Sequence, residues 1–255
     1  AAGVAYSSNG LEPQRLGNGD LLVAWWKNPT GQSSELFIAH FNLAQRQWSD
    51  PINLQSETGM QYLDDVVLLP TGLLLSGRGY TQLTLSDESE FVVFANMGTD
   101  YAFTLIDIGS TQGQQDEETA SCITGNDSGQ AMAVWHKRTN DDSAIYAKRL
   151  SEGVWGESAR VGASTSEFPT INCALSSSGN ALVSWARWIN PWGSSAGSVN
   201  TLEYAHYLAT ADYWSPTIAL LSQPYAYFPA YIRTSDQGFI LNWTVGELRH
   251  SQDVR

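Results

Sequence analysis

Acidic residues recur along this chain about 50 residues apart, a spacing that brings such groups together when a chain repeats one structural unit. They are Glu12, Asp64, Asp65, Glu117, Glu118 and Glu167. Carboxyl groups gathered in one place can act as acid and base on a glycosidic bond, and they can also bind Ca²⁺ through their oxygens. Basic residues recur beside them, so ion pairs that only support the fold are a third interpretation. These basic residues are Lys27, Arg78, Lys137, Arg138 and Arg187.

The candidate catalytic residues are one acid from each of the first three units, namely Glu12, Asp65 and Glu118. Side chains alternate between the two sides of a strand, and the sequence leaves open whether Asp64 or Asp65 faces a shared site. No cofactor is expected, with Ca²⁺ among the acids as the alternative. The four histidines lack the spacing of a transition-metal site, so no such metal is predicted.

A second group of residues is aromatic and follows the fourth unit. The segment 187–193 reads Arg-Trp-Ile-Asn-Pro-Trp-Gly, so Trp188 and Trp192 lie in an otherwise polar loop. Indole rings stack on the apolar faces of sugar rings, while Arg187 and Asn190 could bond to hydroxyl groups. Glu167 and Tyr227 complete the candidate ligand-binding set. The alternative is that both tryptophans fold back over the sheet as a hydrophobic lid.

Five copies of one pattern position these residues. A polar turn that ends in glycine leads into an apolar segment and then an aromatic residue. The glycine and aromatic pairs are Gly19 and Trp25, Gly129 and Trp135, Gly179 and Trp185, and Gly238 and Trp243, while the copy at Gly72 lacks the tryptophan. Several short strands per unit at this period predict an all-β fold, a single five-bladed β-propeller with four antiparallel strands (a to d) per blade.

The predicted blades span residues 9–58, 59–112, 113–163, 164–222, and 223–255 together with 1–8. The fifth unit ends after strand c, so we expect segment 4–7 to supply its fourth strand and to close the ring, unless the sequence was cut from a longer array. Strand b is almost wholly apolar, as expected of strands buried on both faces. Strand d opens with Trp48, Trp155 and Trp214 in three blades. The long loops between strands b and c predict the functional face, at the mouth of the central channel.

The composition excludes some partners. A formal net charge of −13 would repel nucleic acid and anionic membranes, and no apolar segment approaches the length of a membrane span. A monomer is expected. Cys122 and Cys173 take similar places in successive units, which leaves open a bridge between neighbouring blades or two buried thiols.

Two stretches carry a resemblance to known proteins. Segment 168–185, which runs from Phe-Pro-Thr-Ile to Ser-Gly-Asn-Ala-Leu-Val-Ser-Trp, and segment 144–156 resemble blades of bacterial extracellular β-propellers of the sialidase-like and lectin-like kind. The resemblance implies a secreted or periplasmic protein. The Asp-box of sialidases, Ser-x-Asp-x-Gly-x-Thr-Trp, is not present, and the nearest match begins at Ser235.

The predicted five-bladed ring is also similar to that of the furanosidase glycoside hydrolases, which place an acid on the inner strand of each of the first three blades. That similarity implies catalytic roles for Glu12, Asp65 and Glu118, although Glu12 stands where those enzymes have Asp. The favoured function is recognition of a carbohydrate or similar polar ligand on the b-to-c face. The alternatives are a glycoside hydrolase and a protein-interaction scaffold.

Overall fold

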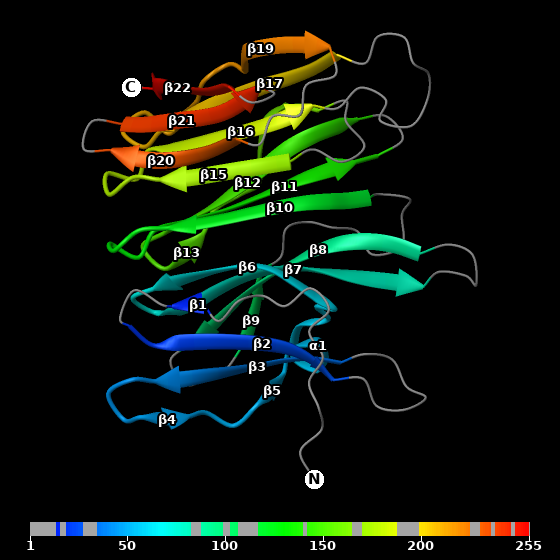
Figure 1. Ribbon diagram of the computed structural model, residues 1–255, viewed down its shortest axis with the longest axis vertical. Coiled ribbons are helices and arrows are strands. Elements are labelled where there is room, and N and C mark those ends of the chain that lie inside the picture. The colour runs from blue at the N-terminus through cyan, green and yellow to red at the C-terminus, as the bar shows by residue number, and fades with distance from the viewer. Residues whose placement is uncertain are drawn as a thin grey trace.

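The structure is a computed structural model, and most of the residues that it describes lie in strands. It describes residues 14–15, 19–27, 35–82, 88–98, 103–106, 117–139, 142–164, 170–187, 199–224, 230–235, 238–245 and 248–254. These residues form five antiparallel sheets, which follow one another in a row as blades 1 to 5 (Figure 1). The predicted all-β fold with five repeated sheets is confirmed.

Within each blade the strands pair with their neighbours in chain order, except that the last strand of blades 1, 3 and 4 pairs with strand c. Blade 1 consists of β1 (Gln14–Arg15), β2 (Leu21–Lys27), β3 (Glu35–Asn42), β4 (Gln47–Trp48) and β5 (Ile52–Asn53), and is followed by the short helix α1 (Leu54–Thr58). Blade 2 consists of β6 (Tyr62–Leu69), β7 (Gly72–Gln82), β8 (Glu88–Gly98) and β9 (Phe103–Ile106). Blade 3 consists of β10 (Glu117–Gly125), β11 (Ala131–Arg138), β12 (Ser143–Ser151), β13 (Val154–Trp155) and β14 (Ala159–Ala163).

The remaining two blades continue the same order. Blade 4 consists of β15 (Thr170–Leu175), β16 (Ala181–Arg187), β17 (Val199–Leu208), β18 (Tyr213–Trp214) and β19 (Ile218–Pro224). Blade 5 consists of β20 (Ala230–Ser235), β21 (Gly238–Val245) and β22 (Leu248–Val254). The last strands that pair with strand c are β5 with β3, β14 with β12 and β19 with β17. The turn between strands a and b needs positive φ, which glycine adopts without strain, and Gly129 has φ 80° while Gly179 has φ 84°.

The outer strand d of blades 1, 3 and 4 is split into two short pieces just after its tryptophan. At the break, the backbone N–H of Ser49 donates to the carbonyl of His40 at 2.8 Å, and Ser215 donates to His206 at the same distance. Blade 2 lacks the tryptophan, and its outer strand β9 is continuous. Trp48, Trp155 and Trp214 lie in the first piece of strand d as predicted, each one residue after the strand begins.

The hydrophobic core lies between the blades. Four clusters of buried side chains join blades 1 and 2, 2 and 3, 3 and 4, and 4 and 5. Strand b of a blade packs against both neighbouring blades. In β11, Trp135 packs toward blade 2 and Val134 packs toward blade 4. This explains why its sequence is almost wholly apolar instead of alternating.

In Figure 1 blade 1 lies at the bottom, while blade 5 overlaps blade 4 at the top. The face of blade 1 directed away from blade 2 carries Trp25, Phe37 and Phe41, which are half-buried, and Trp48, which is 49% exposed. In blade 4 the matching residues Trp185 and Tyr207 are buried against blade 3. Segment 4–7 lies outside the described residues, so closure of the ring stays a prediction.

A disulfide joins Cys122 in β10 to Cys173 in β15, with a Cα–Cα distance of 6.0 Å. Of the two alternatives that the sequence left open, the structure has the bridge between neighbouring blades. Among the described residues, no helix is long and apolar enough to cross a membrane.

Candidate functional site

Most of the predicted site residues lie outside the residues that the structure describes. This is the case for Glu12, Glu167, Trp188, Asn190, Trp192 and Tyr227. For Glu118 and Arg187 the backbone is described, in β10 and β16, but the side chain is not. The predicted aromatic site therefore stays a prediction. Two parts of the b-to-c face are described in detail, one at the start of blade 2 and one at the turn of blade 3.

The two adjacent acids of blade 2 lie on its inner strand β6, where the pairing with β7 is irregular. Tyr62 lies opposite Arg78 and Leu63 opposite Gly77, but Asp65 lies opposite Ser76, so Asp64 is an inserted residue. A bulge of this kind redirects the side chains on either side of it. It explains why strict alternation could not decide between the two acids.

Asp64 forms an ion pair with Arg78 beside an exposed aromatic ring. The Arg78 Nε donates to both carboxylate oxygens of Asp64, at 3.1 Å each. The guanidinium lies 5.5 Å from the centre of the Tyr62 ring, a distance typical of cation–π contact. The Tyr62 side chain remains 43% exposed. Burial raises the pKa of Asp64, an effect that the nearby Arg78 charge opposes.

Blade 1 supports the same group of residues. The ring of Trp26, at the end of β2, lies 6.2 Å from the ring of Tyr62, and its Nε1 donates to the carbonyl of Gln61 at 3.0 Å. Trp26, Tyr62, Asp64 and Arg78 are called the Tyr62 cluster below. The cluster presents an exposed aromatic ring next to a pair of opposite charges, an arrangement able to hold a flat polar ligand such as a sugar ring.

Asp65 is directed away from this cluster and engages the neighbouring blade. Its Oδ1 accepts from its neighbour Val66 N–H at 2.8 Å, and the carboxylate also accepts from the backbone N–H of Ile123 in β10 of blade 3. Burial raises the pKa of Asp65, and the charge of Asp64 adds to that rise. Asp65 therefore links the inner strands of blades 2 and 3.

Cys122 takes the same place in blade 3 as Asp65 in blade 2. Asp65 lies opposite Ser76 and Cys122 opposite Val134, and each of these partners is the fourth residue of its apolar segment. Cys122 also reaches the inner strand of the next blade, through its disulfide to Cys173. The two links follow one construction, in which this inner position ties blade 2 to blade 3 and blade 3 to blade 4.

Glu118 lies elsewhere in the repeat. It pairs with Lys137, which comes after the tryptophan of β11, and the register shifts between Glu118 and Ser121. Glu118 is thus nearer than Asp65 to the b-to-c loops. The sequence predicts Asp65 and Glu118 at equivalent positions of successive blades. The strand register shows that they lie at different positions along the inner strands.

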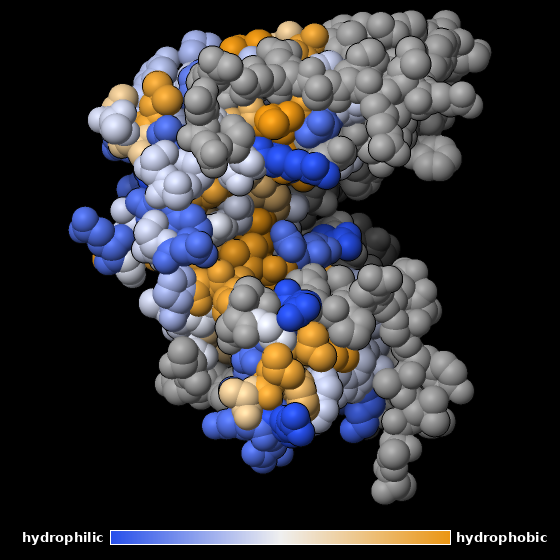
Figure 2. All heavy atoms as spheres, turned by 60° about the vertical axis from the view of Figure 1, so that its left-hand side comes forward, coloured by the Kyte–Doolittle hydropathy of each residue, from blue (hydrophilic) through white to orange (hydrophobic). Residues whose placement is uncertain are grey.

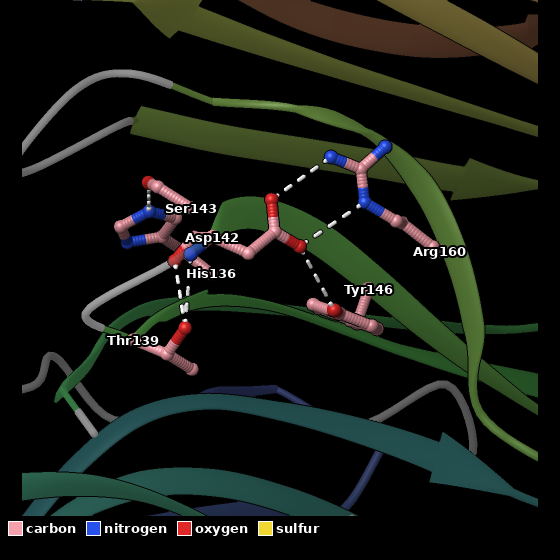
Figure 3. A network of polar contacts seen from close by, with 6 residues as sticks. All are labelled: His136, Thr139, Asp142, Ser143, Tyr146 and Arg160. Atoms are coloured by element: carbon pink, nitrogen blue, oxygen red, sulfur yellow. Dashed lines mark hydrogen bonds and ion pairs between the residues drawn. The ribbon is translucent and has the colours of Figure 1, made fainter.

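A polar network holds the b-to-c turn of blade 3 (Figure 3). The buried ring of His136 bonds through Nε2 to the Ser143 hydroxyl at 2.9 Å, and burial, aided by the charge of Arg138, lowers its pKa to about 4. Asp142 accepts from Arg160 at 3.0 Å and from the Tyr146 hydroxyl at 3.4 Å. This network fixes the turn, so His136 has a structural role here.

Sequence reasoning missed Tyr62. The sequence could have pointed to it, because Tyr62 begins the same inner strand as the two acids and pairs with Arg78 on the neighbouring strand. Among the described residues, no group of three or more His, Cys, Asp and Glu side chains is arranged to hold a metal ion.

Several solved structures with a similar fold are of carbohydrate-active proteins. The α-L-arabinanase of Penicillium chrysogenum complexed with arabinobiose shares 15% identity, with a TM-score of 0.54 over 97% of this chain and 80% of that one. The GH93 α-L-arabinofuranosidase of Fusarium graminearum, also with arabinobiose, shares 11% identity, with a TM-score of 0.54 over 94% and 77% of the two chains.

An ulvan lyase of family PL25, bound to an oligosaccharide of glucuronate and sulfated rhamnose, shares 11% identity, with a TM-score of 0.57 over 96% of this chain and 69% of that one. The predicted β-propeller fold is confirmed. At these identities the likeness concerns the fold alone. No protein family model and no curated protein sequence matches the chain.

Proposed function

We propose that this β-propeller binds carbohydrate on its b-to-c face, with the Tyr62 cluster contacting the sugar. The observation that carries the proposal is the exposed Tyr62 ring, held between Trp26 and the Asp64–Arg78 ion pair. A ring fixed in this way can stack on a sugar with little loss of conformational entropy, and the charged pair offers both donors and acceptors to hydroxyl groups. The carbohydrate-active neighbours support a ligand of this class.

The residues predicted from the sequence extend this proposal. Trp188 and Trp192 would add stacking surfaces from the loop that follows β16, and Arg187 and Asn190 would add hydrogen bonds. Because these residues and the Tyr62 cluster both belong to the b-to-c side, we propose that a ligand longer than one sugar contacts both groups.

The Tyr62→Ala variant tests the proposal. We expect it to weaken binding of arabino-oligosaccharides at least about fivefold, because the stacking contact of an aromatic ring contributes about 1 kcal/mol beyond its buried area. Isothermal titration calorimetry measures the change. The matched control is Tyr213→Ala, since Tyr213 is 52% exposed but lies on the outer strand β18. Equal affinity of the two variants would contradict a site at Tyr62.

Glycoside hydrolysis is the second candidate, and one observation favours it. Burial raises the pKa values of both Asp64 and Asp65, as a general acid requires. The contacts argue for binding instead, because Arg78 holds Asp64 and two backbone N–H groups hold Asp65. In a hydrolase, Asp65→Asn would abolish release of reducing sugar and leave binding intact. In a binding protein the same variant would leave binding intact and the wild type would release none.

A further inference from the structure

The charges of the Tyr62 cluster differ from those of a site for acidic sugars. Arg78 directs its Nε at both oxygens of Asp64, so this cation is already matched by an anion. The Asp64 side chain is only 24% exposed, which makes its separation from Arg78 costly. Asp65 follows directly in the sequence, and its half-buried carboxyl group, although directed away from the pair, is near enough for its charge to interact with that of Asp64.

We propose that the Tyr62 cluster selects neutral sugars and rejects sugars that carry a carboxylate or sulfate. This inference rests on the proposed function and specifies its ligand class. An anionic group that binds Arg78 competes with Asp64 for the guanidinium and is repelled by the charge of that half-buried carboxylate. A hydroxyl group, by contrast, can donate to Asp64 and accept from Arg78 while the ion pair stays intact.

The net negative charge of the whole chain also disfavours binding of anionic sugars. The sequence has 26 acidic and 13 basic residues, so an anionic glycan is repelled before it reaches the site. The fold itself does not decide the ligand class, because its neighbours include proteins bound to the neutral arabinobiose and to a glucuronate-containing oligosaccharide. The Asp64–Arg78 pair is the local feature that decides it here.

Titration of two oligosaccharides of equal length, one neutral and one containing glucuronate, tests the inference. We expect the wild type to bind the neutral sugar at least tenfold more tightly at low salt. Added salt should narrow the difference, because it screens the repulsion of the anionic sugar. Tighter binding of the glucuronate sugar would overturn the inference and leave the proposed function standing. Binding of neither sugar would overturn both.

The Asp64→Asn variant tests the role of the ion pair directly. The amide no longer neutralises Arg78, so we expect the ratio of neutral to acidic affinity to fall about tenfold. The control is Asp127→Asn, which changes the net charge equally but lies in the exposed turn between β10 and β11. An unchanged ratio in Asp64→Asn, or an equal change in both variants, would overturn the inference. The salt dependence of the wild type tests it without any variant.

Discussion

His136 is completely buried in β11, and its neighbours determine its charge. Its pKa lies at about 4 in the folded protein against an ordinary value of 6.5, because burial disfavours the charged ring. Between these two values the unfolded chain binds a proton that the folded chain does not. The neutral ring therefore stabilises the fold fully above pH 6.5, and this contribution is lost as the pH falls toward 4.

The expected size of this loss is about 3 kcal/mol between pH 7 and pH 4, measured by urea denaturation. His136→Asn removes the ionisable group and should reduce the loss. Ser143→Ala removes only the hydrogen-bond partner of the ring, so it should lower stability at every pH and keep the pH dependence. Identical pH profiles of His136→Asn and the wild type would contradict the assignment.

The strands themselves could be predicted from the sequence, because one pattern repeats and its glycines and tryptophans mark the turns. Gly129 and Gly179 lie in the expected turns with positive φ, and Trp48, Trp155 and Trp214 lie in the first piece of the outer strands. The candidate site could not be predicted in the same way. The bulge at Asp64 and the register shift after Glu118 break the alternation on which the sequence argument depended.

The inner strands of blades 2, 3 and 4 are linked by side chains at one repeated position, which is Asp65 in blade 2 and Cys122 in blade 3. Asp65 therefore links blade 2 to blade 3. Asp65→Ala should lower the free energy of unfolding by about 1–3 kcal/mol, because it deprives the Ile123 N–H of its acceptor. Asp65→Asn keeps an acceptor oxygen and removes the cost of burying a charge, so it should be close to neutral at pH 7. Chemical denaturation compares the three proteins. Equal losses in both variants would show that the charge, and not the hydrogen bond, is what matters.

At the scale of the whole molecule, no hydrophobic cluster of the described residues joins blade 1 to blade 5. Figure 2 shows hydrophobic residues reaching the surface between hydrophilic ones on one side of the molecule. The face of blade 1 with Trp25, Phe37 and Trp48 corresponds to faces that are buried between blades elsewhere. We propose that this face packs against a completed blade 5. We also propose a secreted or periplasmic location, because disulfides persist in oxidising compartments.

The disulfide between Cys122 and Cys173 spans 51 residues, and these include most of blade 3. A single cut between the two cysteines, for example in the b-to-c turn near residues 139–142, therefore produces two pieces that stay covalently joined. After limited proteolysis there, we expect one band of full-length mass on a non-reducing gel and two smaller bands after reduction. Two bands without reductant would contradict the bridge. A protein of this kind would tolerate nicking by proteases while keeping its mass, a useful property outside the cell.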